Sequence, residues 1–230
     1  MKSSNQNFIQ KPNRYLGNPR KKDFYDIFLD KINNNKIKSV LELGCATGDF
    51  LYYLPDNIKG TGIDISKVLI KEANKSRKKD NLNFICVDLF KYNPATKPDL
   101  VVMTGFLCTF LKFQSIINKA LSLSKRFIFI NDFINNFNVD CKYSFREKNE
   151  DNFQIPYNIW SKKTISEYLD KKKINYKIEP YIMHSWIKRN KNPLYNFHAK
   201  INKKKVLINN GGIILDGCNI FITKDDYKST

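Results

Sequence analysis

The chain has 230 residues, which is enough for one domain with a sizeable core and too few for two. Its formal net charge is +18, and 34 of its 40 basic residues are Lys. Proteins that recognise phosphates or guanines favour Arg, because its planar guanidinium makes paired hydrogen bonds. The Lys bias therefore argues against specific nucleic-acid binding.

The N-terminal segment has no apolar signal-peptide core, and the longest nearly apolar run, residues 100–111, is too short to span a bilayer. The five cysteines are odd in number and widely spaced, and they contain no Cys-x-x-Cys pair. This pattern predicts reduced thiols in a cytoplasmic protein and no metal site.

The first 132 residues alternate between helical and strand patterns. The spacing of Phe24, Ile27, Phe28 and Ile32 predicts a helix over 21–32, packed ahead of the first strand and helping to cover the ligand site. Strands are predicted at 38–43, 60–65, 82–87, 99–104 and 127–130. The helices between them are predicted at 50–54, from the N-cap Ser66 to about 78, and at 111–124. This alternation predicts a parallel sheet with helices on both faces.

The rest of the chain departs from this alternation. Residues 133–160 are polar and aromatic without a clear period, which predicts an insertion that folds as a lid over the carboxyl end of the sheet. A helix is predicted to begin near Ser161 or Thr164, since Thr164 and Glu167 form a capping box. Extended segments are predicted at 174–183, 194–201, 205–208 and 213–223, with a tight turn at 209–212.

A turn of small residues follows the first predicted strand and carries the strongest signal in the chain. Gly44, Ala46 and Gly48 alternate there, and twenty residues past Gly44 a second strand ends in Asp64, where a ribose diol would sit. A dinucleotide would require a third glycine, but Asp49 occupies that position. Glu42 and Asp49 would also repel a pyrophosphate. The turn favours a ligand with a ribose, no phosphate and positive charge, such as S-adenosylmethionine.

Four segments in this order resemble motifs I to IV of the class I S-adenosylmethionine-dependent methyltransferases. They are Glu42–Gly48, Gly62–Ser66, Val87–Leu89 and Asp99–Thr104. The resemblance covers roughly residues 36–132, and the family has glycine where this chain has Ala46, which we interpret as tighter packing. It implies a doubly wound, mostly parallel seven-stranded α/β sheet of the Rossmann-like methyltransferase fold, with a C-terminal antiparallel hairpin. We expect one domain over 1–230, with an N-terminal helical cover at 1–35, a cofactor-binding half at 36–132, and the lid and C-terminal sheet half at 133–230.

The resemblance assigns a role to each motif residue. The methionine part of the cofactor is expected against Gly44, Cys45, Ala46 and Gly48, with Glu42 facing its ammonium group. Asp64, next to Ile65, is expected to accept both ribose hydroxyls. Asp88 and the Leu89 N–H are expected at the adenine, although Asp88 is also typical of a strand-end turn. Thr104 and Gly105 end the strand where the family places the reacting methyl group.

Methyl transfer needs a base only when the acceptor is a hydroxyl or a protonated amine. His184 and Asp132 are the candidates, but His184 is equally suited to a structural hydrogen bond and Asp132 to capping a loop. His198 alternates within a predicted strand, which favours a structural position.

The residues after the fourth predicted strand narrow the acceptor class. Amino-methyltransferases of bases carry Pro-Pro-aromatic there, but this chain has Met103–Phe106 without proline. Cys108 comes directly after Leu107, so it does not fit a cytosine C5 nucleophile. Tyr157 and Trp160 of the lid are expected to contact the acceptor. We expect a small-molecule acceptor, with a sugar or nucleotide sugar favoured. RNA or protein as acceptor, and a scaffold that binds cofactor without catalysis, remain alternatives, and no oligomeric state is predicted.

Overall fold

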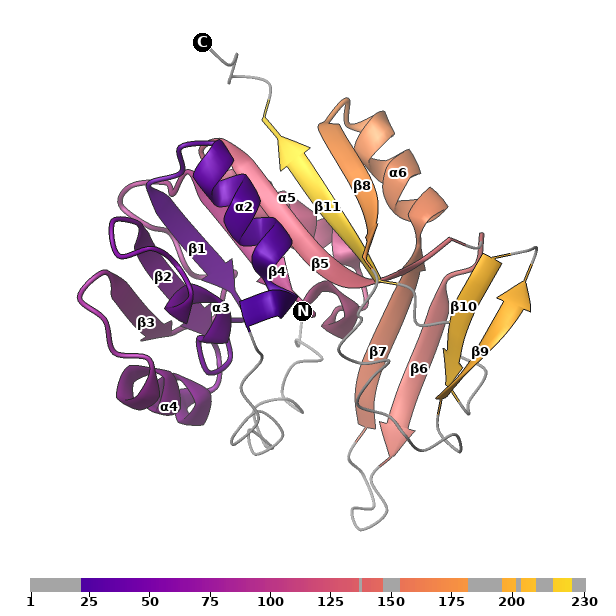
Figure 1. The fold of residues 1–230 in the computed structure, drawn as a ribbon, viewed down its shortest axis with the longest axis horizontal. Helices are drawn as coiled ribbons and strands as arrows, with labels where there is room; N and C mark the ends of the chain where they lie inside the picture. The colour runs from indigo at the N-terminus through magenta and orange to yellow at the C-terminus, as the bar shows by residue number, and fades with distance from the viewer. Residues whose placement is uncertain are drawn as a thin grey trace.

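The computed structural model describes residues 22–136, 138–146, 154–181, 196–201, 204–209 and 217–224. Its main sheet has the strand order β3-β2-β1-β4-β5-β11-β8 (Figure 1). The bounds of these strands are β1 (Ser39–Leu43), β2 (Lys59–Asp64), β3 (Leu82–Cys86), β4 (Leu100–Thr104), β5 (Phe127–Asn135), β8 (Asn175–Tyr181) and β11 (Gly217–Thr223).

The first five strands of this order are parallel, and β11 runs antiparallel to both of its neighbours, β5 and β8. The predicted doubly wound, mostly parallel sheet is therefore confirmed. Strand order reverses between β1 and β4, and ligands of open α/β sheets bind outside the carboxyl ends of the strands at such a switch point.

Helices cover both faces of the sheet (Figure 1). One face packs against α2 (Asp26–Asn34), α3 (Asp49–Tyr52) and α4 (Lys67–Ser76), and the other against α5 (Phe113–Leu123) and α6 (Lys162–Lys171). Short 3-10 turns, η2 (Lys22–Phe24) and η3 (Leu107–Thr109), precede α2 and α5. Alternate strand residues enter separate cores, so Phe129 packs under α2 while Ile130 belongs to the α5 side.

Two serine caps explain where helices begin. The Ser66 hydroxyl accepts a hydrogen bond from the Leu69 amide at 3.4 Å, as predicted, and starts α4. Ser161 starts α6 by accepting from the Thr164 amide at 3.0 Å, which settles the two predicted starting positions in favour of Ser161.

The segment predicted as a lid insertion, residues 133–160, consists largely of strands. β5 continues to Asn135, and β6 (Cys141–Arg146) and β7 (Gln154–Ser161) form an antiparallel hairpin that pairs with the end of β5 through Ile134 and Trp160. The predicted strand ended at residue 130, because β5 is buried over nearly its whole length and therefore shows no period-two pattern that would mark its end. A separate antiparallel pair, β9 (Asn196–Ile201) and β10 (Lys204–Asn209), follows.

Within the part of the chain that the structure describes, no helix is long and apolar enough to cross a membrane.

Candidate cofactor-binding site

The turn after β1 is anchored to the neighbouring strand β2. The amides of Gly44 and Cys45 donate to the Ile63 carbonyl at 2.9 and 3.1 Å, and the Gly48 amide closes the turn on the Cys45 carbonyl at 2.8 Å. Three residues of this turn have left-handed backbones, with φ of 69° at Gly44, 46° at Ala46 and 76° at Gly48. Glycine adopts this conformation at no steric cost, whereas Ala46 adopts it with strain.

Aromatic rings lie directly against both glycines. A Cβ built on Gly44 would lie 2.2 Å from Cδ2 of Phe106, and one on Gly48 would lie 2.4 Å from Cε1 of Phe84. The turn therefore needs glycine for close packing as well as for its backbone. Phe106 lies two residues after the end of β4, so its contact brings the end of that strand against the glycine turn.

Asp64 ties the turn to the end of β2. Its two carboxylate oxygens accept from the Ala46 amide at 3.1 Å and from the Ser66 amide at 2.8 Å. Burial raises the pKa of this carboxyl, and the backbone donors oppose that shift in part. Each carboxylate oxygen can accept more than one hydrogen bond, so Asp64 keeps acceptor sites for a diol.

A second carboxylate lies beneath the turn. Glu42 is 2% exposed, and its Oε1 accepts from the Thr104 hydroxyl at 3.2 Å, which links the ends of β1 and β4. The Cys45 thiol is also buried, and burial together with the charges of Glu42 and Asp64 raises its pKa well above the usual range. The thiol therefore stays protonated, and the carboxylates give the site negative charge.

Charge repulsion at the turn is smaller than the sequence suggests. The Arg77 guanidinium contacts Asp49 Oδ1 through Nη2 at 2.9 Å and Nε at 3.2 Å, and both side chains are mostly buried. Asp49 is thus paired, and this corrects the expectation that it repels a pyrophosphate. The exclusion of a dinucleotide now depends on the missing third glycine and on the carboxylate of Glu42.

The remaining predicted cofactor residues lie at neighbouring strand ends. Asp88 Oδ1 accepts from the Phe90 amide at 2.9 Å, which is the turn-forming role considered as its alternative. Leu89 is 7% exposed, and Ile65 follows Asp64 half-buried. Gly105, with φ of 60°, donates its amide to the Asn131 carbonyl at 2.7 Å.

Asp132 holds the loop that follows β4. It is 4% exposed, its Oδ2 accepts from the Cys108 amide at 3.1 Å, and its Oδ1 accepts from the Phe133 amide at 2.8 Å. Burial raises the pKa of this carboxyl to about 6. The side chain caps η3, which was one of its two predicted roles, and its role as a base stays a prediction.

The structure describes only some of the other residues predicted to act in catalysis or acceptor binding. His184 lies outside the described residues, and the backbones of Tyr157 and His198 lie in β7 and β9 without a described side chain. Trp160 is 8% exposed and packs against Phe113, with ring centroids 5.0 Å apart. Its ring lies in the core instead of on an open wall, although its indole N–H has no acceptor among the described residues.

Three buried asparagines near this site were missed in the sequence. Asn158 donates to the carbonyls of Cys108 and Phe110 at 3.1 and 2.8 Å, and so helps Asp132 to position η3. Asn131 donates to Asn219 Oδ1 at 2.8 Å across β5 and β11. Asparagine is uncommon inside strands, so its presence in otherwise apolar strands was the available signal.

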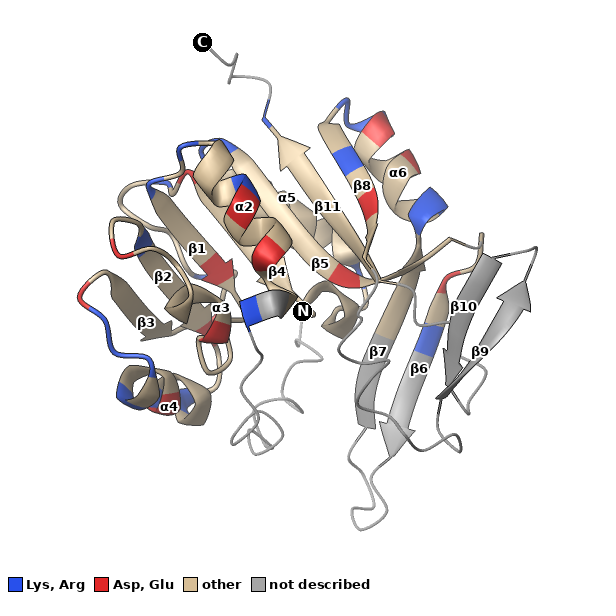
Figure 2. Ribbon diagram, in the orientation of Figure 1, with Lys and Arg blue, Asp and Glu red and all other residues tan. Residues whose placement is uncertain are grey.

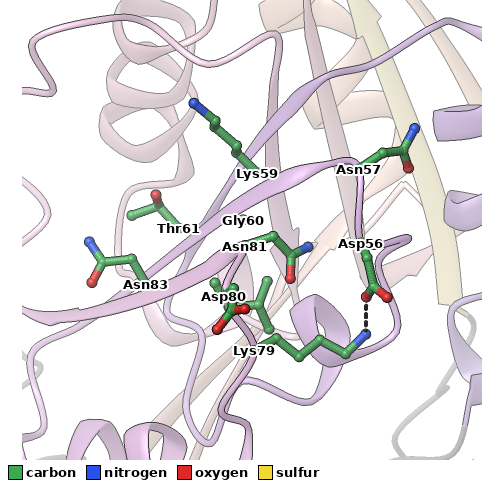
Figure 3. A pocket seen from close by; sticks show the side chains of 10 residues that line it. Asp56, Asn57, Lys59, Gly60, Thr61, Lys79, Asp80, Asn81 and Asn83 are labelled. Carbon is green, nitrogen blue, oxygen red and sulfur yellow. Dashed lines mark hydrogen bonds and ion pairs between the residues drawn. The ribbon is translucent and has the colours of Figure 1, made fainter.

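A surface groove lies at the opposite end of the sheet from this site. Its lining comes from the amino ends of β2 and β3 and the loops before them, including Lys59, Thr61, Lys79 and Asn83 (Figure 3). Lys79 is paired there with Asp56 at 3.1 Å. The groove therefore does not belong to the cofactor site. Among the described residues, no three His, Cys, Asp or Glu side chains gather as metal ligands would.

Comparison with known proteins identifies relatives of this chain. Residues 34–180 match a family model described as a methyltransferase domain. Malonyl-[acyl-carrier protein] O-methyltransferase 2 from Ilyobacter polytropus is 36% identical over 83 residues, which are 34% of this chain and 31% of that protein. The chain thus spans about a third of the length of this relative.

Solved structures share the whole fold at low sequence identity. The complex of DhpI with SAM and HEP has a TM-score of 0.60 at 15% identity, covering 93% of this chain and 91% of that one. Magnesium protoporphyrin IX methyltransferase (ChlM) from Synechocystis PCC 6803 with bound SAM has a TM-score of 0.57 at 12% identity, covering 96% and 93%. An S-adenosylmethionine-dependent methyltransferase from Clostridium acetobutylicum has a TM-score of 0.58 at 14% identity, covering 94% and 96%.

Proposed function

Because the chain belongs to the methyltransferase domain family, we propose that it transfers the methyl group of S-adenosylmethionine to an oxygen or nitrogen of a small-molecule acceptor. The family match confirms the resemblance drawn from the four motifs. The acceptor class that we favour is a sugar or a nucleotide sugar.

The observation that carries this proposal is the pair of carboxylates around the glycine turn. Glu42 and Asp64 lie at the carboxyl ends of adjacent strands β1 and β2, on the two sides of Gly44. Negative charge at this position suits a ligand with an ammonium and a sulfonium, and Asp64 keeps acceptor sites for ribose hydroxyls. The residues present therefore fit S-adenosylmethionine, which supplies an activated methyl group when bound.

The protein's own contribution is alignment and exclusion of water. Thr104 and Gly105 end β4 beside the glycine turn, and Phe106 lies against Gly44. Asp132 and Asn158 hold the following turn, η3, from two sides. This arrangement keeps the end of β4 fixed where an acceptor has to approach.

Support for a sugar or nucleotide sugar comes from polarity and charge. The hydroxyl of Thr104 ends β4, and the amide of Asn131 lies beside it within β5, and such groups suit an acceptor rich in hydroxyls. The net charge of +18 would attract the phosphates of a nucleotide sugar. All five cysteines are free, which agrees with our proposal of a cytoplasmic protein.

Binding and turnover test the proposal separately. Calorimetry with S-adenosylhomocysteine should show binding, and the ligand should raise the melting temperature. Incubation with methyl-labelled S-adenosylmethionine and a metabolite extract should then move label into a small-molecule fraction. Heat with NAD but none with S-adenosylhomocysteine would refute the cofactor assignment. Binding without label transfer to any fraction would favour the non-catalytic scaffold.

The predicted pocket wall can be tested at Tyr157, whose position lies in β7. Tyr157→Ala should impair turnover while S-adenosylhomocysteine affinity stays within about threefold. Trp160→Ala is less suitable, because removing a buried tryptophan costs about 3–5 kcal/mol of stability. His184→Ala tests the base: higher pH should partly restore its turnover if His184 accepts a proton.

A macromolecular acceptor, RNA or protein, is the second candidate, and surface charge favours it. Figure 2 shows Lys and Arg on α4, on α6 and on the loops at the strand ends. Among the described residues, four lysines take part in ion pairs: Lys31, Lys79, Lys163 and Lys177. A protein acceptor also has a precedent, since the name of the relative from Ilyobacter polytropus gives it an acyl-carrier protein as acceptor. We expect RNA binding to be weak and to vanish by roughly 200 mM salt. A complex that survives such salt would favour this second candidate.

A further inference from the structure

A row of polar side chains crosses the sheet at the carboxyl end of β4. Backbone pairing places Thr104 beside Asn131, Asn131 beside Asn219, and Asn219 beside Glu179. Cross-strand partners project to the same face of a sheet, so this polar row continues from β4 to β8.

The row lies just beyond an apolar layer under α2. Phe129 lies two residues before Asn131 on β5, and Phe221 lies two residues after Asn219 on the antiparallel β11. Both rings pack against Phe28 of α2, with centroids 5.6 and 5.8 Å from its ring centroid. Side chains two residues apart on a strand share a face, so Asn131 and Asn219 lie on this same face, nearer the carboxyl end of β4. The Gly105 amide, which ends β4, donates to the Asn131 carbonyl at 2.7 Å.

One donor in this row has no acceptor. Asn131 donates to Asn219 Oδ1 at 2.8 Å, but the Nδ2 of Asn219, whose side chain is fully buried, has no hydrogen-bond partner among the described residues. Asn158 is buried to a similar degree, but its Nδ2 donates to two backbone carbonyls, as expected of an amide with a structural role. A buried amide donor without an acceptor is rare in native proteins and calls for an explanation.

An aromatic residue, Tyr181, lies next to the row on β8, two positions after Glu179. Gly217 lies two residues before Asn219 on β11, and its partners on the neighbouring strands are Phe133 and Tyr181. A Cβ on Gly217 would lie 3.0 Å from the Tyr181 carbonyl oxygen and 3.3 Å from its Cδ1. The Tyr181 hydroxyl donates to the Phe24 carbonyl at 3.3 Å, and both rings are half-buried. The Tyr181 ring also packs edge-on against the Phe24 ring, with centroids 5.7 Å apart.

We propose that Asn219 is an acceptor-recognition residue, whose amide N–H donates to a carbonyl, carboxylate or hydroxyl oxygen of the acceptor. This inference rests on the proposed methyl transfer to a small molecule. Asn131 fixes the orientation of the amide by donating to its oxygen. An acceptor that lacks the oxygen leaves the donor unpaired, and the site discriminates against it for that reason.

Side-chain amide resonances test the subsite without knowledge of the acceptor. Protein labelled with 15N in asparagine and saturated with S-adenosylhomocysteine is titrated with acetate, N-methylacetamide and glycerol. The Asn219 and Asn158 resonances are assigned by their loss in Asn219→Leu and Asn158→Leu. Saturable shifts of the Asn219 amide, with the Asn158 amide unmoved, are expected from at least one probe. No shift of the Asn219 amide with any of the three overturns the proposal.

A double variant tests the role in turnover. Asn131→Leu/Asn219→Leu replaces both amides by apolar groups of similar shape, so it should melt at or above the wild-type temperature, whereas Asn158→Leu should melt lower. The double variant should keep S-adenosylhomocysteine affinity within about threefold and lose about tenfold or more of label transfer to the metabolite extract. Wild-type label transfer by the double variant overturns the proposal. If the wild type labels nothing while the Asn219 amide still shifts, methyl transfer is refuted and the subsite stands.

Discussion

Ala46→Gly should stabilise this protein. Ala46 is the one residue of the glycine turn with a side chain in the left-handed region, at φ of 46°, and it lies between Gly44 and Gly48. The left-handed conformation costs an L-residue about 1–2 kcal/mol. Glycine would remove that strain but would add about 0.4–1 kcal/mol of unfolded-state entropy. The net gain expected from these two effects is about 0.5–1 kcal/mol.

Thermal unfolding measures this gain directly. For a domain of this size, about 0.5–1 kcal/mol corresponds to a rise in melting temperature of roughly 1–4 °C. Ala73→Gly is the matched control, because Ala73 lies fully buried inside α4 with an ordinary helical backbone. The same chemical change there should cost about 1 kcal/mol.

The ligand response completes the test. The Ala46 amide donates to Asp64, and glycine retains that donor, so S-adenosylhomocysteine affinity should be unchanged or higher. A fall in melting temperature for Ala46→Gly would refute the strain argument. It would show that the methyl group packs favourably, as the sequence pattern suggests.

Further predictions concern the carboxylates of the site. Asp64→Ala should weaken S-adenosylhomocysteine binding by roughly 2–3 kcal/mol in calorimetry, and wild-type affinity would contradict the ribose assignment. Burial raises the Asp132 pKa from 3.8 to about 6, so the native state holds this proton more tightly than the unfolded state. Stability should therefore fall by about 3 kcal/mol as pH rises from about 4 to 6 in urea titrations, and Asp132→Asn should abolish that slope. Arg77→Ala should cost about 1–2 kcal/mol because it removes the ion pair with the mostly buried Asp49, and an unchanged urea midpoint would show that the ion pair is not stabilising.

Local pattern alone was enough to predict the strands and helices of residues 36–132. The glycine turn, the N-cap Ser66 and the carboxylate Asp64 are encoded over a few residues, because turn geometry and strand ends depend on short-range sterics and spacing. Alternation of strands and helices likewise restricts the sheet to a parallel order with few alternatives. The prediction of this region and the structure agree for that reason.

The region proposed to bind the acceptor could not be predicted in the same way, because its structure depends on contacts between residues far apart in the sequence. Asp49 is paired with Arg77 across 28 positions, and Asn131 with Asn219 across 88, and both pairs exist because sheet register and helix packing bring distant residues together. No strand was predicted within residues 133–160, but they contain the end of β5 and a hairpin, since a strand buried on both faces lacks alternation. Trp160, predicted to line a pocket, lies in the core because β7 pairs with the end of β5. Sequence alone thus determined the family and the glycine turn, while tertiary pairing decided which buried polar groups find hydrogen-bond partners among the described residues.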